Sequence, residues 1–218
     1  MSTTNAADDM IRNAQNAASQ AALSPADAIQ LLKDGNDRFV SRNPVSRDLH
    51  SQIEQTATGQ YPFSAVLSCI DSRIPTEIIF DQGIGDLFNA RIAGNFVNED
   101  ILGSLEFACK LAGSKVIVVM GHTSCGAVKG ACDKAELGNL TQMLDKIAPA
   151  VNAISTPPGE DRSSANIDFV NKVAMKNVEL TIADIKSKSP VLAEMQQNGD
   201  IDIVGAMYDV KSGKVSFA

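Results

Sequence analysis

The sequence predicts one α/β domain, in which a mainly parallel β-sheet is flanked by α-helices and preceded by an N-terminal helical arm. Continuous apolar runs, such as residues 65–67 and 115–120, are typical of strands that are buried on both faces. These runs alternate with segments whose apolar residues recur at helical spacing, and that alternation indicates a parallel sheet. The composition of the 218 residues shows no break between two domains. We therefore expect the arm over residues 1–23 and the α/β domain over residues 24–218.

The first helix of this domain is expected to begin after Ser24. Ser24 is a favoured N-cap, Pro25 suits the first turn, and Asp27 stands at the capping-box position. Apolar residues at helical spacing continue from there to about residue 42. Residues 43–60 are polar and contain an Asn-Pro pair, which predicts a loop with about one helical turn.

The remaining elements follow from the same two patterns and from the Gly and Pro residues between them. One strand is expected to end at Cys69, and the others are expected over residues 87–92, 115–120, 201–207 and 215–217. Helices are expected over residues 75–80, 98–112, 125–137, 140–154, 166–187 and 190–197. A surface loop with a central Pro-Pro-Gly is expected over residues 156–165.

Composition and charge argue against several classes of protein. The formal net charge of −7 and the pI near 4.8 disfavour a nucleic-acid-binding surface, which would gather Lys and Arg. No apolar stretch is long enough to span a bilayer, so no membrane partner is expected. The first 22 residues contain no apolar core of a secretory signal, which favours a cytoplasmic location. In that reducing compartment, cysteines favour metal binding or catalysis over disulfide bonds.

Two short runs contain side chains that bind zinc. Cys69, Asp71 and Arg73 follow a predicted strand, and their spacing by two places them on one side of an extended backbone. His122 ends another strand, and Cys125 begins the next helix, where the helix dipole favours a thiolate. The carboxyl ends of parallel strands meet at one edge of a sheet, so we expect both runs to share a site. Because zinc prefers thiolate sulfur and imidazole nitrogen, the combination predicts zinc binding.

Each of these residues also has a plainer interpretation. Cys69 and Cys125 could form a disulfide, and Asp71 and Arg73 could be an ion pair without a catalytic role. The conjunction of the two runs favours the metal site. Outside the site, we interpret Cys109 and Cys132 as core cysteines, Phe39, Phe63 and Phe107 as core aromatics, and His50 as an exposed histidine rather than a proton relay.

With these motifs the chain resembles the β-class carbonic anhydrases from about residue 24 to residue 217. The specific signatures are Cys69-x-Asp71-x-Arg73 and His122-x-x-Cys125-Gly126. Further matching positions are Gly59-Gln60, Asp86-Leu87-Phe88, Arg91, Gly94-Asn95, Gly103-Ser104-Leu105-Glu106 and Gly205-Ala206-Met207-Tyr208-Asp209. The resemblance implies a zinc-dependent carbonate dehydratase, a lyase that converts CO₂ and water reversibly to bicarbonate and a proton by means of zinc-bound hydroxide.

The resemblance also implies roles for individual residues. Cys69, His122 and Cys125 would be the Zn²⁺ ligands. Asp71 and Arg73 would form the catalytic dyad, and in a closed state of the site Asp71 would become a fourth zinc ligand. The substrate pocket would be lined or bordered by Gln60, Phe88, Gly126 and Ala93, the last standing where plant-type members have Val.

The expected ligands are CO₂ and bicarbonate, and the expected partner is a second copy of the chain. The resemblance implies a homodimer or a larger dimer-based assembly, with the pocket at the subunit interface and the N-terminal helices embracing the partner. Two other functions stay open on the sequence. One is a structural zinc-binding or interaction protein, and the other is a related hydrolase on the same scaffold, such as one that acts on carbon disulfide. An assay of CO₂ hydration separates both from the main interpretation.

Overall fold

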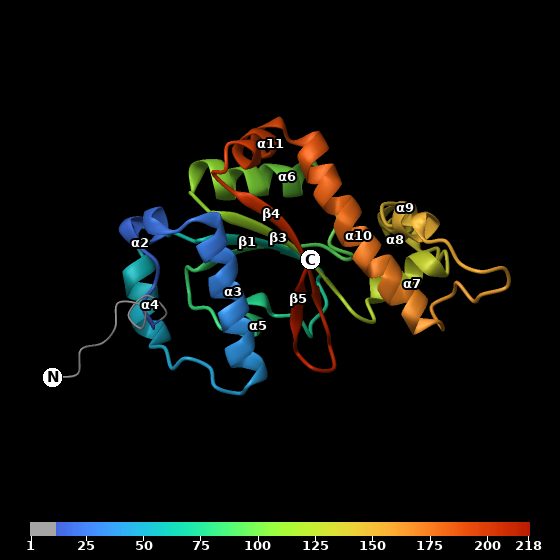
Figure 1. Ribbon diagram of the computed structural model, residues 1–218, viewed down its shortest axis with the longest axis horizontal. Coiled ribbons are helices and arrows are strands. Elements are labelled where there is room, and N and C mark those ends of the chain that lie inside the picture. The colour runs from blue at the N-terminus through green and yellow to red at the C-terminus, as the bar shows by residue number, and fades with distance from the viewer. Residues whose placement is uncertain (1–11) are drawn as a thin grey trace.

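A five-stranded sheet forms the centre of the computed structural model, which describes residues 12–218 (Figure 1). Its strands are β1 (Ser64–Ser68), β2 (Leu87–Arg91), β3 (Val116–His122), β4 (Asp202–Tyr208) and β5 (Val215–Phe217). They lie in the order β2-β1-β3-β4-β5, in which the first four run parallel and β5 pairs antiparallel with β4. The sheet confirms the predicted fold class, and the predicted strands are correct to within two residues at each end.

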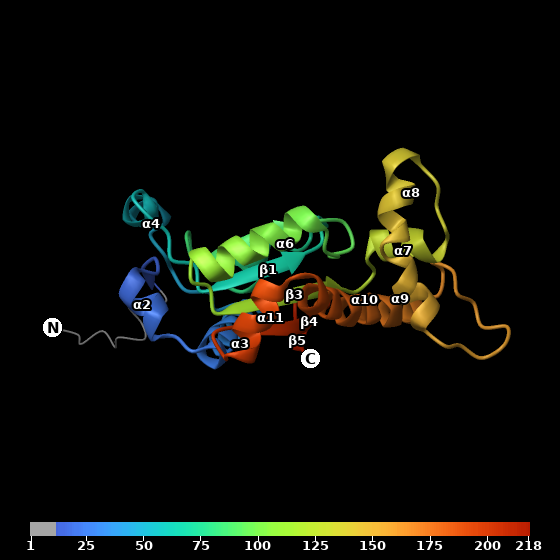
Figure 2. The same cartoon turned by 90° about the horizontal axis from the view of Figure 1, so that it is seen from above.

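Helices cover both faces of this sheet. On one face lie α3 (Pro25–Val40) and α5 (Thr76–Ile79), and on the other lie α6 (Glu99–Glu106) and α11 (Pro190–Gln197), as the two core clusters and the views in Figure 1 and Figure 2 show. The long helix α10 (Ile167–Lys188) contributes side chains to both layers. The remaining helices are α2 (Ala17–Ala22), α4 (Leu49–Thr56), α7 (Gly126–Cys132), α8 (Gly138–Asp145) and α9 (Ala148–Ala153).

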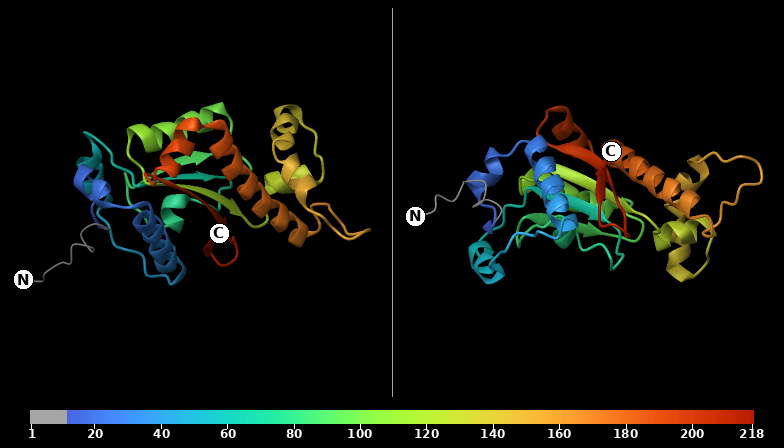
Figure 3. Two further views of the ribbon diagram at one scale, coloured as in Figure 1. Left: turned by 45° about the horizontal axis from the view of Figure 1, so that its top comes forward. Right: turned by 60° about the horizontal axis from the view of Figure 1, so that its bottom comes forward.

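The two core layers meet across β1 and β3, which are buried along their whole length. Alternate residues of a strand point to opposite faces, so Val66 and Val118 pack in the α3 layer while Leu67 and Val119 pack in the α6 layer. Burial on both faces explains the continuous apolar runs in the sequence. The helices α7, α8 and α9 gather beyond one end of the sheet (Figure 3).

Several predicted helices are confirmed. The capping box at the start of α3 is present, because Asp27 N donates to Ser24 Oγ at 3.2 Å and Ser24 N donates to Asp27 Oδ2 at 3.0 Å. The helices predicted over residues 75–80, 166–187 and 190–197 correspond to α5, α10 and α11.

The loop with about one helical turn predicted over residues 43–60 contains a longer helix, α4, which makes about two turns over Leu49–Thr56. Asp48 is the N-cap of this helix, and its carboxylate accepts a hydrogen bond from the first turn. The buried Gln52 side chain joins two distant segments, since its Nε2 donates to Arg12 O and its Oε1 accepts from Ile84 N, both at 2.9 Å. Such long-range hydrogen bonds stabilise a helix whose polar sequence shows little apolar periodicity.

Three other helices end at residues that differ from the prediction. The helix expected over residues 98–112 is α-helical only to Glu106 and continues as a π-helical segment, η1 (Phe107–Leu111). The helix expected over residues 125–137 ends at Cys132, because Lys134 adopts a positive φ of 52°. The helix expected over residues 140–154 is divided into α8 and α9, because Pro149 near the start of α9 has no N–H with which to continue a helix.

Phe107 is not the core residue that we expected, since its side chain is 50% exposed. Leu105, Ala108 and Cys109 occupy the inner side of this helical segment, so Phe107 falls on the outer side. For the other residues interpreted above, Phe63 and Cys109 are buried, Phe39 and Cys132 are partly buried against the core, and His50 is exposed, although it lies in α4 rather than in a loop.

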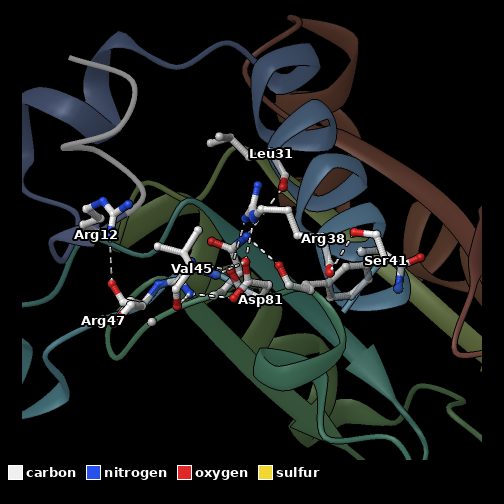
Figure 4. A network of polar contacts seen from close by, with 12 residues as sticks. Arg12, Leu31, Arg38, Ser41, Val45, Arg47 and Asp81 are labelled. Atoms are coloured by element: carbon white, nitrogen blue, oxygen red, sulfur yellow. Dashed lines mark hydrogen bonds and ion pairs between the residues drawn. The ribbon is translucent and has the colours of Figure 1, made fainter. Parts of the chain in front are cut away.

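The buried carboxylate of Asp81 connects α3 to the segment that precedes α4 (Figure 4). Arg38 Nε donates to Asp81 Oδ2 at 2.5 Å, and Arg47 Nη1 donates to Asp81 Oδ1 at 2.6 Å. The backbone N–H of Val45 also donates to Oδ2 at 3.1 Å. Asp81 follows α5, so one side chain joins three separate segments of the chain.

The described part of the predicted arm packs on its own domain. Gln20 in α2 is buried, and its Nε2 donates to Pro62 O and to Ala112 O, both at 2.8 Å. Residues 1–11 of the predicted arm lie outside the described residues. Among the helices of residues 12–218, none has the length and apolar character needed to cross a membrane.

Candidate metal centre

Cys69, His122 and Cys125 meet at the carboxyl ends of β1 and β3. Cys69 directly follows β1, His122 is the last residue of β3, and Cys125 is the N-cap of α7. Their ligand atoms all lie within 4.8 Å of one another, and all three residues are buried. Because β1 and β3 are parallel neighbours, their ends bring together two runs that are far apart in the sequence.

The geometry of the three ligand atoms fits a zinc ion. The two Sγ atoms are 4.0 Å apart, close to the roughly 3.8 Å expected for two sulfurs in tetrahedral zinc coordination and far from the ~2 Å of a disulfide. Both residues are free cysteines, so the alternative of a disulfide between them is wrong.

The imidazole of His122 is also arranged as a metal ligand would be. Its Nδ1 lies 3.0 Å from the Thr123 carbonyl oxygen, which favours the tautomer with the proton on Nδ1. Its Nε2 is buried and has no hydrogen-bond partner within residues 12–218. A buried nitrogen lone pair without a partner is unfavourable, and a metal ion in the cluster would satisfy it.

The environment of the thiols separates Cys69 from the other three cysteines: its pKa is lowered, whereas the hydrogen bond to Cys69 and burial raise the pKa of Cys125. A hydrogen bond from the Cys125 thiol is the main cause that lowers the pKa of Cys69, and the Gly94 N–H, 3.4 Å from Cys69 Sγ, acts in the same direction. Burial raises the pKa of Cys109 to about 12 and that of Cys132 to about 11, so both remain ordinary thiols.

Asp71 and Arg73 form a two-point ion pair beside the cluster. Arg73 Nε donates to Asp71 Oδ1 at 2.9 Å, and Arg73 Nη2 donates to Oδ2 at 2.7 Å. These hydrogen bonds are the main cause of the lowered pKa of Asp71. Asp71 Oδ2 lies 3.8 Å from His122 Nε2, so the carboxylate borders the ligand cluster while it is paired with the arginine.

Arg91 holds the backbone of Cys69 and Asp71 in the first run, a role that the sequence motifs did not indicate. Its Nε donates to Cys69 O at 2.9 Å, and its Nη2 donates to Asp71 O at 2.6 Å. Arg91 ends β2, the strand paired with β1, so its side chain reaches the segment that follows β1. A charged residue at the end of the neighbouring strand is the signal that could have indicated this contact.

Helix α10 holds the two loops next to the cluster through two asparagine side chains. Asn171 Oδ1 accepts from Ser124 N at 2.9 Å, between His122 and Cys125. Asn177 Nδ2 donates to Gly94 O at 2.7 Å. The two asparagines, of which Asn177 is buried among mostly apolar residues, are the signal that α10 offers for these contacts.

A cavity of about 240 Å³ opens beside the cluster. It is lined by Cys69, Ile70, Asp71, Ala93, Gly126, Ala127, Gly130, Leu140, Met143 and Leu144. Ala93 and Gly126, two of the predicted pocket residues, therefore border this cavity. Gln60 is exposed and Phe88 borders a larger cavity of about 610 Å³ between β2 and α6, so neither is brought to this cavity within the single chain.

Comparison with known proteins identifies related chains. The family model for carbonic anhydrase matches residues 64–215. Carbonic anhydrase 2 of Mycobacterium tuberculosis is 34% identical over 199 residues, which cover 87% of this chain and 91% of the relative. The structure of a β-carbonic anhydrase from Aspergillus fumigatus aligns with a TM-score of 0.66 at 26% identity, over 88% of this chain and 89% of that one. A structure of tetrameric β-carbonic anhydrases from Sordaria macrospora aligns with a TM-score of 0.66 at 24% identity, over 76% and 84% of the two chains.

Proposed function

This chain belongs to the β-class carbonic anhydrase family, whose reaction is the reversible hydration of CO₂ to bicarbonate and a proton, and on that premise we propose that Cys69, His122 and Cys125 hold the zinc that the reaction uses. The observation that supports this assignment best is the buried cluster of two thiols and an imidazole nitrogen without a hydrogen-bond partner within residues 12–218. Zinc bound there supplies hydroxide at neutral pH, because it lowers the pKa of a water ligand to about 7.

Asp71 is proposed to accept the hydrogen bond that orients the attacking oxygen toward CO₂. An acceptor must be ionised for this role, and the hydrogen bonds from Arg73 keep the pKa of Asp71 low. The same hydrogen bonds hold the carboxylate away from the ligand cluster, so it orients the nucleophile without displacing it. Asp71 and Arg73 thus form the catalytic dyad.

The cavity beside the cluster is proposed to bind CO₂. Leu140, Met143 and Ala93 give it an apolar wall, which suits a small molecule that needs little polar recognition. A Cβ added at Gly126 would meet no atom within 4 Å, so the glycine leaves open space on that side. Asp71 also lines this cavity, and its Oδ2 lies 3.8 Å from His122 Nε2.

The functional unit is proposed to be a homodimer or a larger dimer-based assembly. Phe88 meets Phe107 edge-on, with ring centroids 6.1 Å apart, in the larger cavity between β2 and α6. Phe107 is 50% and Leu111 is 76% exposed, so this side of the chain presents an apolar surface. A second copy seated on it would cover these side chains and bring Phe88 to the partner's substrate pocket. One of the related structures is described as tetrameric.

The site also supports a proposed location and domain organisation. Cys69 and Cys125 bind zinc only when reduced, which favours the cytoplasm. Residues 24–218 contain every residue of the proposed centre and are proposed as the catalytic domain. Cell fractionation tests the location, and recovery of the protein mainly outside the cytoplasm would contradict it.

The decisive experiment combines zinc content with the rate of CO₂ hydration. Purified protein should contain about one zinc per chain, and Cys69→Ser should lose both zinc and activity, because a serine oxygen is a poorer zinc ligand than a thiolate. Cys132→Ser is the matched control and should keep both, since Cys132 lies outside the cluster. A fully active preparation without metal would exclude the proposed centre. A zinc-loaded protein that does not hydrate CO₂ would instead favour the structural or carbon disulfide alternative.

A further inference from the structure

We propose that Asn177 of α10 is a positioning residue of the metal centre, which acts on the Cys69 sulfur through the backbone of Gly94. The inference rests on the proposed function, because it concerns how strongly a zinc ligand donates electrons to the metal. Two successive hydrogen bonds connect the three residues.

The first hydrogen bond joins Asn177 to Gly94. The Asn177 side chain is buried, with 3% of the residue exposed, and its Nδ2 donates to Gly94 O at 2.7 Å. A buried amide needs such a partner, so the hydrogen bond fixes the side chain in this direction. Helix α10 has 22 residues and packs against β3 and β4, which makes the amide part of a well-supported element.

Gly94 is confined by its other contacts as well. Its φ of 81° is a conformation that glycine adopts readily and other residues do not. A Cβ at this position would lie 2.4 Å from Ile147 Cδ1. The N–H of Asn95 donates to Ile92 O at 2.9 Å and closes a turn around Gly94. The hydrogen bond from Asn177 fixes the orientation of the carbonyl in this turn.

The second hydrogen bond joins the turn to the metal ligand. Gly94 N donates to Cys69 Sγ at 3.4 Å, so the turn directs an N–H at the sulfur. A donor that points at a thiolate withdraws electron density from it and orients its remaining lone pairs. With two thiolates around one zinc, weaker donation from one sulfur leaves the metal a stronger Lewis acid. Asn177 therefore supports acidification of the water ligand without contacting it.

The surroundings of Asn177 show that packing alone does not require an amide there. Its neighbours Val173, Ala174 and Val178 on α10 are buried and apolar. The buried Thr181, one turn further along, offers a control position of similar burial on the same helix. A leucine at position 177 would keep the branched shape of the side chain but could not hold the Gly94 carbonyl.

The test uses the zinc-loaded protein and its variants Asn177→Leu and Thr181→Val. We measure transfer of zinc to a competing chelator, the pH profile of CO₂ hydration and the melting temperature. Relative to Thr181→Val, Asn177→Leu should bind zinc about 10–100-fold more weakly, the usual range for loss of an outer-shell partner, because the lone pairs of Cys69 are no longer held in the direction of the metal. Its pH profile should move to higher pH, because Cys69 then donates more electron density to the metal.

The outcomes separate this inference from the proposed function. Wild-type protein that contains no zinc would exclude the metal centre itself. Wild-type protein that holds zinc, with Asn177→Leu matching Thr181→Val in both zinc transfer and pH profile, would overturn the role of Asn177 and leave the centre in place. If Asn177→Leu does not fold, Asn177→Ala takes its place. Failure of both to fold while Thr181→Val folds would also overturn the inference, because Asn177 would then be a purely structural residue.

Discussion

The carboxylate of Asp71 stands between two partners, and this single side chain separates two states of the centre. Both of its oxygens accept hydrogen bonds from Arg73, while Oδ2 lies 3.8 Å from the ligand nitrogen of His122. In the structure the pair with Arg73 is formed. Without the arginine, the same carboxylate is close enough to become a fourth zinc ligand.

Arg73→Ala should therefore inactivate the enzyme without removing its metal. The released Asp71 carboxylate would cap the zinc, and hydration should fall on the order of 10²-fold, as is common when one charged catalytic hydrogen bond is lost. Zinc content and stopped-flow rates measure the two effects. Arg42→Ala, at an exposed arginine, is the control and should leave both unchanged. If Arg73→Ala hydrates CO₂ at the wild-type rate, the ion pair of Asp71 and Arg73 has only a structural role.

The same pair predicts a pH dependence. Hydrogen bonds from Arg73 lower the pKa of Asp71, so folding favours the ionised carboxylate. The stability from this pair is present above the unfolded pKa of about 3.9 and is lost as the pH falls through the lower folded value. In metal-free Arg73→Ala, the pKa of Asp71 should rise, and an NMR titration of its carboxyl carbon would detect the change. An identical titration in wild type and variant contradicts the argument.

The residues of the centre differ in how far the sequence could predict them. The meeting of Cys69, His122 and Cys125 was predictable. Zinc-binding residue types that follow an apolar strand are visible in the local sequence, and parallel strands bring their carboxyl ends together. Arg91 and Asn177 were not predictable, since each acts through a backbone carbonyl of a distant segment. Any residue type has such a carbonyl, so the sequence does not mark the residue that accepts the hydrogen bond.

Among the elements, α3 and the segment before α4 depend on one buried carboxylate. Asp81→Ala would leave the guanidinium groups of Arg38 and Arg47 without their shared acceptor, and Arg47 is 6% exposed. Loss of one partner of a buried ion pair destabilises by roughly 3–5 kcal/mol, so the midpoint of urea unfolding should fall clearly. Asp37→Ala, at an exposed aspartate of α3, should change the free energy of unfolding by less than about 0.5 kcal/mol. Equal midpoints in the two variants would show that Asp81 contributes little.

The helices that the sequence predicted poorly also depend on features that apolar periodicity does not record. Apolar periodicity predicted α3, α10 and α11, because each packs an apolar face on the sheet. It could not predict the full length of α4, which Gln52 holds through hydrogen bonds to residues outside the helix. The π-helical segment after Glu106 was also beyond prediction, since the apolar spacing of residues 98–112 fits a continuous α-helix.

At the scale of the whole molecule, the apolar surface between β2 and α6 predicts self-association. Phe107→Glu would place a charge in the proposed interface, so the protein should shift toward monomers in size-exclusion chromatography with light scattering. Activity should fall with the shift, because Phe88 would no longer reach the partner's pocket. Leu137→Glu, at a side chain that is 70% exposed outside this surface, should change neither. A wild-type protein that is monomeric and fully active would contradict the proposed assembly.

Because the two cysteines lie far apart along the chain, zinc binding should also stabilise the folded protein. Cys69 and Cys125 are 56 positions apart, so a bound ion cross-links the ends of two neighbouring strands and closes a long loop of the unfolded chain. A disulfide that closes a loop of such length stabilises by about 4 kcal/mol in the chain-entropy model, and we expect an effect of that order from zinc. Urea denaturation of the zinc-loaded and metal-free protein measures it, and equal midpoints would contradict the idea. In a cell short of zinc, the metal-free protein would then unfold and be degraded. The cell would lose protein molecules as well as the activity of those that remain.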